Sequence, residues 1–169
     1  MDVTTLRTLQ KPLKDSYRAD PGTAIVRLYA EGRLEGEGVT CTVSTWAGPA
    51  RAGLHPSAAG DGSDACSGDM LLQAVAACAG VTVRSVALAT GVELRDARVL
   101  VEGDFDARGT LGVDREAPVG LTDVRITLAF DTDAEDAAVE RLVALTERYC
   151  VVAQTLAHPP RLSVTRTGA

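Results

Sequence analysis

The feature that most constrains the fold is an apolar stretch over residues 70–83 that holds no charged residue. It continues to about residue 90 as a predicted helix that begins at Asp69, with Ser67 as its N-cap. Because apolar residues lie on all sides of this helix rather than along one stripe, both sides must be covered. The stretch is shorter than the ~20 residues that a bilayer requires, and Arg84 follows it, which favours a buried central helix over a membrane span. A chain of 169 residues is too short to cover every side of such a helix easily, so we expect a second subunit to cover part of it.

Shorter elements are predicted on both sides of this helix. Before it, we expect a polar N-terminal arm over residues 1–22, a hairpin of strands 24–29 and 39–46 around a charged turn (31–38), and a loop over 48–62. Gly91 ends the helix. After it we expect two strands, 92–106 and 121–131, and then a helix over 134–148 that Thr132 or Asp133 caps. A short helical turn, 149–156, and a last strand, 162–165, are expected to follow. Strands and helices form separate blocks, which predicts an α+β fold, with one domain over residues 23–169.

The composition is that of an acidic globular protein. Hydrophobic residues make up 46% of the chain and charged residues 24%, which excludes a wholly disordered chain. The net charge of -6 repels phosphate backbones, so we expect no nucleic-acid partner. The N-terminus has no apolar segment typical of a signal peptide. We therefore expect a cytoplasmic protein with reduced thiols and no membrane partner.

Four cysteines carry the most reactive side chains of the sequence. Cys78 lies in the middle of the apolar helix and Cys150 at the end of the next long helix, where a buried, inert thiol is the commonest role. Cys41 lies on the apolar face of its predicted strand and is expected in the core. Cys66 directly precedes a helix N-terminus, whose dipole lowers a thiol pKa. By local physics alone, Cys66 is the best reactive thiol.

Motifs for metals, nucleotides and serine nucleophiles are absent from the sequence. No two cysteines have C-x2-C spacing, and His55 and His158 stand alone, so we expect no metal site. The glycine-rich phosphate-binding motifs and G-x-S-x-G are also missing. We therefore expect no metal and no organic cofactor.

Two stretches around Cys78 and Cys150 share their patterns with one known family. Residues 67–78 (SGDMLLQAVAAC) have an acidic residue, two leucines, small residues and a cysteine, and residues 149–156 (YCVVAQTL) surround the second cysteine. Both stretches, and the order of elements over roughly residues 24–166, resemble the OsmC/Ohr family (osmotically inducible protein C and organic hydroperoxide resistance protein). The resemblance implies an intertwined α+β homodimer, with a long buried central helix packed between antiparallel sheets.

The same resemblance implies a thiol peroxidase that reduces organic hydroperoxides. Cys78 would attack the peroxide and become a sulfenic acid, Cys150 would resolve it as a disulfide, and an external dithiol would reduce that disulfide. An arginine from the N-terminal strands would lower the pKa of the attacking thiol. Arg33 matches this arginine best by position, and Arg51 is the second choice. Asp69 is the nearest match to the carboxylate that orients it.

Residues beside the second motif modify these expectations. Val151 stands where the peroxidase branches of the family commonly have proline. Glu147 lies three residues before Cys150, and on one helix face its carboxylate would disfavour a Cys150 thiolate and leave Cys150 with the higher pKa. Cys66 could compete as the resolving thiol. The alternatives are a non-catalytic dimer that binds a small hydrophobic molecule in an apolar inter-subunit groove, and another thiol chemistry on the same fold.

Overall fold

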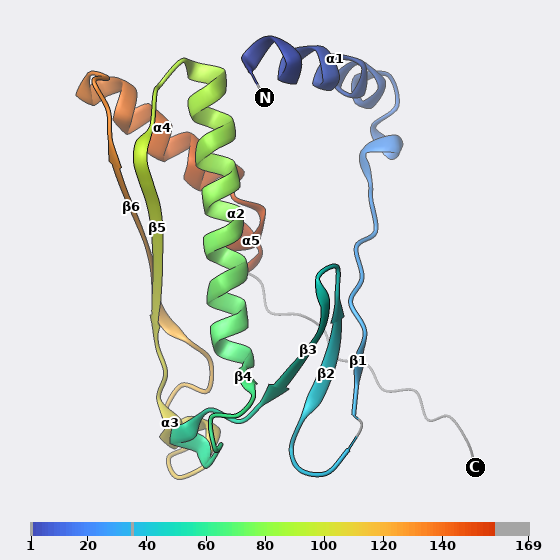
Figure 1. Ribbon diagram of the computed structural model, residues 1–169, viewed down its shortest axis with the longest axis vertical. Coiled ribbons are helices and arrows are strands. Elements are labelled where there is room, and N and C mark those ends of the chain that lie inside the picture. Colours follow the sequence, from blue (N-terminus) through green and yellow to red (C-terminus); the bar gives the residue numbers. More distant parts are fainter. Residues whose placement is uncertain (1, 35, 158–169) are drawn as a thin grey trace. The chain divides into compact units, whose positions relative to one another are not determined.

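The computed structural model describes residues 2–34 and 36–157, and it contains helices and two sheets (Figure 1). The chain divides into two compact units: the first holds Met1–Gln73 and Leu100–Thr127, and the second holds Ala74–Val99 and Leu128–Ala169. Strands and helices come in separate blocks along the chain, so the predicted α+β class is confirmed. The predicted last strand, residues 162–165, and His158 lie outside the described residues.

The first unit begins with a helix, α1 (Val3–Ala19), where the sequence predicted a polar arm. The Asp2 carboxylate caps it by accepting the N–H of Thr5 at 2.9 Å, and Asp15 pairs with Arg18 at 2.8 Å one turn away. None of its residues is buried. Local capping and ion pairing therefore stabilise this arm as a helix.

Residues 24–29 do not form the predicted strand. A short 3-10 helix, η1 (Pro21–Ala24), precedes them, and residues 25–31 have no regular secondary structure. The side chains of Leu28 and Tyr29 are 86% and 93% exposed. The prediction is wrong within the described chain because β-branched and aromatic residues form a strand only beside a partner that pairs with their backbone.

The first unit also contains a four-stranded sheet. Its strands lie in the order β1 (Gly32–Arg33), β2 (Cys41–Thr45), β3 (Gly48–Gly53) and β4 (Ala65–Cys66). The first three are antiparallel, and β3 and β4 are parallel.

Two predictions around β2 need correction. The partner of β2 in the predicted hairpin is β1, in which Gly32 lies opposite Val43, so the pairing falls inside the predicted charged turn. Residues 48–53 are a strand rather than part of a loop, and a second 3-10 helix, η2 (Pro56–Ala58), follows them. The sequence of β3 contains only glycine, proline, alanine and one arginine, which are weak strand formers, so pairing with β2 determines its conformation.

The predicted apolar helix is present as α2 (Ser67–Thr90). It begins at Ser67 itself, which is therefore the first helical residue rather than the predicted cap. Its end matches the prediction: Gly91 adopts a left-handed conformation (φ 76°), and the N–H of Val92 donates to the carbonyl of Ala87 at 3.0 Å.

The α2 helix is long and apolar enough to cross a membrane by length and composition alone, a test that the core helix of a soluble protein also passes. Of its most apolar window, 33% is buried within this chain, and Val81 is 72% exposed. Among residues 2–34 and 36–157, the cover that the sequence requires on every side of α2 is therefore incomplete.

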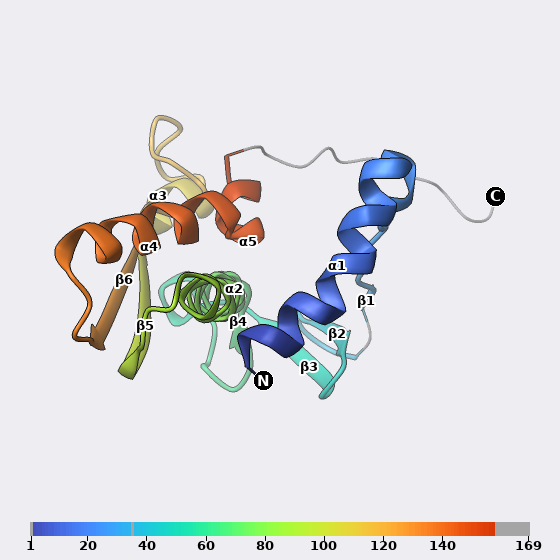
Figure 2. The same cartoon turned by 90° about the horizontal axis from the view of Figure 1, so that it is seen from above.

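The second unit packs part of α2 against α4 (Asp136–Tyr149), as the view along α2 shows (Figure 2). Its core consists of aliphatic side chains of these two helices, namely Val83, Val86, Ala87 and Leu142. Strands β5 (Arg95–Asp104) and β6 (Thr122–Asp131) pair with each other, as predicted, and Leu128 and Phe130 of β6 pack on this core.

The α4 helix begins later than predicted, and neither predicted residue caps it. Its N-cap is Glu135, without a side-chain hydrogen bond. The Thr132 hydroxyl instead accepts the N–H of Ala134 at 3.2 Å, and Asp133 accepts from Arg95 at 2.8 Å. Both predicted caps are therefore engaged elsewhere.

Candidate active site

Cys78 lies in the middle of α2, on the side that faces the interior of the second unit. Its neighbours Val75 and Ala79 are fully buried, whereas Cys78 itself is half-buried. Thr82 follows one helical turn later, which places its hydroxyl beside the Cys78 sulfur. The thiol is thus accessible from one side and held by packing on the other.

Cys150 lies at the junction between α4 and a short helix, α5 (Val151–Thr155). Its backbone is extended (φ -73°, ψ 96°), so it ends one helix and begins the next. Its N–H donates to the carbonyl of Thr146 and its carbonyl accepts from Gln154, both at 3.0 Å. With 1% of its surface exposed, Cys150 is among the most buried residues of the chain.

These two thiols, far apart in the sequence, meet in the second unit. Both are free, and they lie close enough for the Cys150 thiol to act on the pKa of Cys78. Burial acts to raise the pKa of Cys78, but the N–H groups of Val152 and Val151, the Cys150 thiol and the Thr82 hydroxyl outweigh it and hold that pKa below its ordinary value. The geometry therefore favours a thiolate at Cys78.

The second thiol shifts in the opposite direction. Burial raises the pKa of Cys150, and the neighbouring Cys78 raises it further, while the N–H of Ala153 only partly opposes this. The expected order, with the higher pKa at Cys150, therefore agrees with the structure. The expected cause does not, because burial and Cys78 produce the shift rather than the carboxylate of Glu147. Glu147 lies inside α4, whereas Cys150 lies beyond its end, so the two residues do not share a helix face.

The other predicted site residues belong to the first unit. Arg33 lies in β1, where its Nε donates to Glu31 Oε1 at 3.2 Å, and Arg51 of β3 pairs with Asp64 at 3.3 Å. Asp69 is exposed in the first turn of α2 and forms no ion pair within the described residues. Both candidate arginines thus have a local carboxylate partner.

The remaining cysteines also belong to the first unit. Cys41 in β2 is half-buried rather than part of the core, and Cys66 directly precedes α2, as predicted. No group of three His, Cys, Asp or Glu side chains that could hold a metal ion occurs among residues 2–34 and 36–157.

Sequence reasoning missed the backbone donors at the start of α5. The N–H groups of Val151 and Val152 point toward the Cys78 sulfur and help to lower its pKa. One signal for them was present in the sequence: a valine rather than a proline follows Cys150, and proline has no N–H to donate. Their target, however, depends on how α4 packs on α2.

Comparison with known proteins agrees with this arrangement. The family model described as OsmC-like protein matches residues 60–165. An OsmC-like protein from Mycoplasma pneumoniae is 15% identical (TM-score 0.63), with 78% of this chain and 88% of that chain covered. A protein from Psychrobacter arcticus is 14% identical (TM-score 0.60), with 80% of this chain and 91% of that chain covered. It is provisionally named an osmotic stress induced and detoxification response protein. A hypothetical protein from Aquifex aeolicus is 21% identical (TM-score 0.59), with 79% and 89% covered. The search of curated proteins gave no match.

The structural likenesses establish the shared fold, and the family match establishes the relationship. That match covers more than half of the chain and includes both Cys78 and Cys150. The chain therefore belongs to the OsmC-like family.

Proposed function

We propose that this protein is a thiol peroxidase that reduces organic hydroperoxides through Cys78 and Cys150. The observation that carries this proposal is that the two thiols lie close enough to shift each other's pKa, with the pKa of Cys78 lowered and that of Cys150 raised. A lowered pKa suits the attacking thiol, because the thiolate is the nucleophile. A raised pKa suits a resolving thiol, which stays protonated until the sulfenic acid has formed.

The proposed reaction proceeds in two steps on the protein. The Cys78 thiolate attacks the outer oxygen of the hydroperoxide, the O–O bond breaks, and the alkoxide takes a proton and leaves as the alcohol. Cys78 is then a sulfenic acid. The Cys150 sulfur attacks the Cys78 sulfur, its proton joins the departing hydroxide to form water, and a disulfide remains. An external dithiol returns both cysteines to thiols by exchange. No cofactor takes part.

The hydrogen-bond donors around Cys78 support this chemistry. The Val152 and Val151 N–H groups and the Thr82 hydroxyl stabilise negative charge on sulfur. A cation would also stabilise the departing oxygen, and we assign this role to Arg33, with Arg51 as the second choice and Asp69 as the residue that positions it. Since Arg33 pairs with Glu31 and Arg51 with Asp64, the active form requires the arginine to change partners.

The proposal includes a cytoplasmic homodimer. The incomplete cover of α2 and the exposed side chains of Leu28 and Tyr29 support a second copy of the chain beside them. We also expect no nucleic-acid or membrane partner.

The decisive experiment maps the thiols after one turnover. Reduced protein receives one equivalent of cumene hydroperoxide and is analysed by peptide mass spectrometry without reduction. We expect a Cys78–Cys150 disulfide within seconds, loss of turnover in Cys78→Ser, and sulfinic acid at Cys78 in Cys150→Ser. Cys41→Ser is the matched control and should behave as the wild type.

Other outcomes separate the alternatives. A Cys78–Cys66 disulfide would keep the peroxidase chemistry and replace the resolving thiol. Undiminished turnover in Cys78→Ser would refute the proposal. Four unmodified thiols would also refute it and would favour the non-catalytic dimer that binds a small hydrophobic molecule.

A further inference from the structure

A cavity of about 520 Å³ lies within the first unit and shares no residue with the Cys78–Cys150 pair. This volume is typical of small-molecule binding sites. Its walls are mainly apolar and come from the loop before η2, the first turns of α2 and the ends of β5 and β6, through Leu54, Leu71, Leu72, Phe105, Val119 and Leu121. Apolar walls of this kind favour a largely apolar ligand.

Two glycines outside the lining, in segments that carry or contact lining residues, allow close backbone contacts that a larger residue would prevent. A Cβ atom at Gly60 would lie 1.8 Å from the carbonyl oxygen of Leu54, and one at Gly109 would lie 2.3 Å from that of Pro118. Gly60 therefore allows the turn that carries Leu54, and Gly109 lets the short helix α3 (Ala107–Thr110) approach the chain before Val119.

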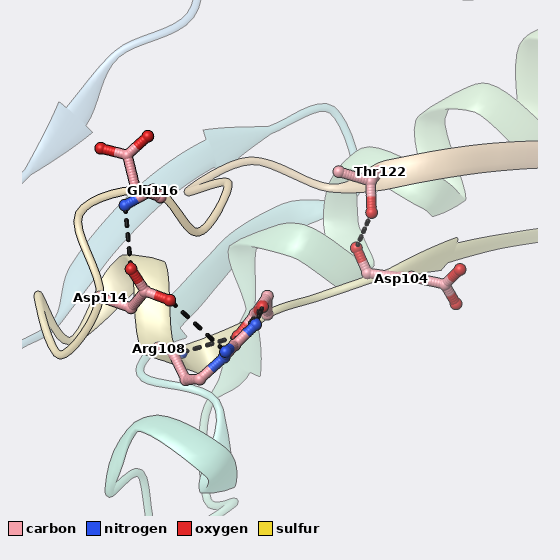
Figure 3. Close-up of polar contacts among 6 residues, drawn as sticks. Asp104, Arg108, Asp114, Glu116 and Thr122 are labelled. Carbon is pink, nitrogen blue, oxygen red and sulfur yellow. Dashed lines mark hydrogen bonds and ion pairs between the residues drawn. The ribbon is translucent and has the colours of Figure 1, made fainter.

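Ion pairs fix the loop that carries α3 (Figure 3). Arg108 pairs with Asp106 at 2.6 Å and with Asp114 at 3.5 Å, and Asp114 also accepts the N–H of Glu116 at 3.0 Å. This loop contributes Thr110 to the cavity. The cavity is therefore formed before any ligand binds, which lowers the ordering cost of binding.

The most specific polar group at the cavity is His55. Its Nδ1 lies 2.6 Å from Ser57 Oγ and accepts the N–H of Ser57 at 3.1 Å. The N–H bond assigns Nδ1 as an acceptor, which in the neutral imidazole places the proton on Nε2. Its ring also packs edge-on against Phe105, with centroids 5.9 Å apart. No hydrogen bond of Nε2 occurs within the described residues, so its N–H is a donor still available to a ligand.

The charges at the cavity do not favour an anion, because the Asp69 carboxylate in the first turn of α2 offsets the positive end of the helix dipole that also lines the cavity. Asp69 is the charged residue among those that line it, and its carboxylate is exposed. A carboxylate ligand would be repelled by Asp69, whereas a neutral oxygen can accept the Nε2–H of His55 without that cost. The cavity therefore favours a neutral molecule with an acceptor oxygen.

We propose that this cavity binds a small, uncharged, largely apolar molecule whose single carbonyl or ether oxygen accepts a hydrogen bond from His55. This site does not include Cys78 or Cys150, although Asp69, to which we assign a positioning role in the peroxidase reaction, also lines it. Cys66 also lines the cavity, so its thiol reports on occupancy without taking part in binding.

The test measures protection of Cys66 in the full-length reduced protein. Alkylation by iodoacetamide is followed at Cys66 and Cys41 by peptide mass spectrometry, with 2-decanone, decane or decanoate added. We expect 2-decanone to slow alkylation of Cys66 and not of Cys41. It should bind about threefold to tenfold more tightly than decane, because one hydrogen bond contributes about that factor. Decanoate, of the same chain length but charged, should protect least.

Variants locate the binding to this cavity. Val119→Trp fills the cavity and should abolish protection, whereas Val113→Trp, in the same loop but outside the cavity, should leave it unchanged; these valines are 65% and 74% exposed. His55→Asn keeps an acceptor for the Ser57 N–H but lacks Nε2, so 2-decanone should lose its advantage over decane. Ligand-observed NMR with the same variants provides a second measurement.

Three results would overturn the inference. They are no effect of 2-decanone up to its solubility limit by either measurement, equal slowing of Cys66 and Cys41, and full protection retained in Val119→Trp. Since the readouts are Cys66 and ligand NMR, each result is independent of whether the chain reduces hydroperoxides.

Discussion

Hydrogen-bond donors rather than burial determine the chemistry of Cys78. Burial alone would raise the pKa of this thiol, and the backbone donors at the start of α5 reverse the shift. Cys150, which is more deeply buried and has Cys78 beside it, shifts upward instead. The opposite pKa shifts of the two thiols therefore arise within one small cluster.

The first prediction concerns the pH dependence of the two thiols. A lowered pKa means that the thiolate forms at lower pH, so Cys78 should reach half of its maximal alkylation rate at a lower pH than Cys150 does. Alkylation rates measured by peptide mass spectrometry between pH 5 and pH 10 would show this order. Coincident profiles, or a Cys150 profile at the lower pH, would contradict the structure.

The second prediction concerns the hydroxyl beside Cys78. Thr82→Val removes one donor to the sulfur at nearly constant volume, so the pKa of Cys78 should rise and its alkylation profile should move to higher pH. Thr82→Ser keeps the hydroxyl and is the matched control. A Thr82→Val profile that superimposes on that of the wild type would show that the hydroxyl does not act on Cys78.

The third prediction concerns the residue after Cys150. Val151→Pro removes a backbone N–H that helps to lower the pKa of Cys78, while the first position of a helix tolerates proline. The pKa of Cys78 should rise with little loss of stability. Val151→Ala, which keeps the N–H, should leave the pKa unchanged, and an equal shift in both variants would assign the effect to the side chain instead.

The sequence identified the two cysteines of the site but not what surrounds them. Cys78 and Cys150 stand out because two motifs place them in a fixed order of elements. The valine after Cys150 indicated that a backbone N–H was available there, but the target of that N–H could not be predicted, since it depends on tertiary packing. The roles of Arg33 and Asp69 stay predictions, because both residues lie in the first unit.

At the scale of elements, the packing of α4 on α2 positions Cys150 in the second unit. Leu142 is fully buried in the core formed with Val83 and Val86. Leu142→Ala should therefore lower the free energy of unfolding by about 2–5 kcal/mol. Its neighbour Val143 is 44% exposed, so Val143→Ala should cost less than about 1 kcal/mol. Urea denaturation measures both, and equal losses would exclude Leu142 as the core contact.

Elements with a strong internal pattern were predictable and elements defined by a partner were not. The uncharged stretch around Cys78 predicted α2, and alternation in residues 121–131 predicted β6. In contrast, β3 has almost no strand formers and exists through pairing with β2. The apolar segment 24–29 has strand formers but no partner within the described residues. Strand formation thus depends on a neighbour that the local sequence does not reveal.

At the scale of the whole molecule, the exposed side of α2 is the surface that the proposed homodimer would use. Ala74, Ala77 and Val81 are exposed and lie three and four residues apart, which places them on one face of the helix. Small side chains in such a row let a second helix approach closely. An exposed apolar face on the longest helix is therefore the expected centre of a dimer interface.

The last prediction tests this face by changing one residue on it. By light scattering after gel filtration, the wild type should have about twice the chain mass of 17.6 kDa. Val81→Asp places a charge where the interface is expected to exclude water, so the dimer should dissociate at least about tenfold more readily. Val113→Asp, in a loop, is the control, because the side chains of Val81 and Val113 are similarly exposed, at 72% and 74%.

Circular dichroism should show both variants folded, because neither side chain is buried. A Val81→Asp protein that stays dimeric at the lowest measurable concentration would exclude this face of α2 as the interface. The cover for the central helix would then have to come from elsewhere.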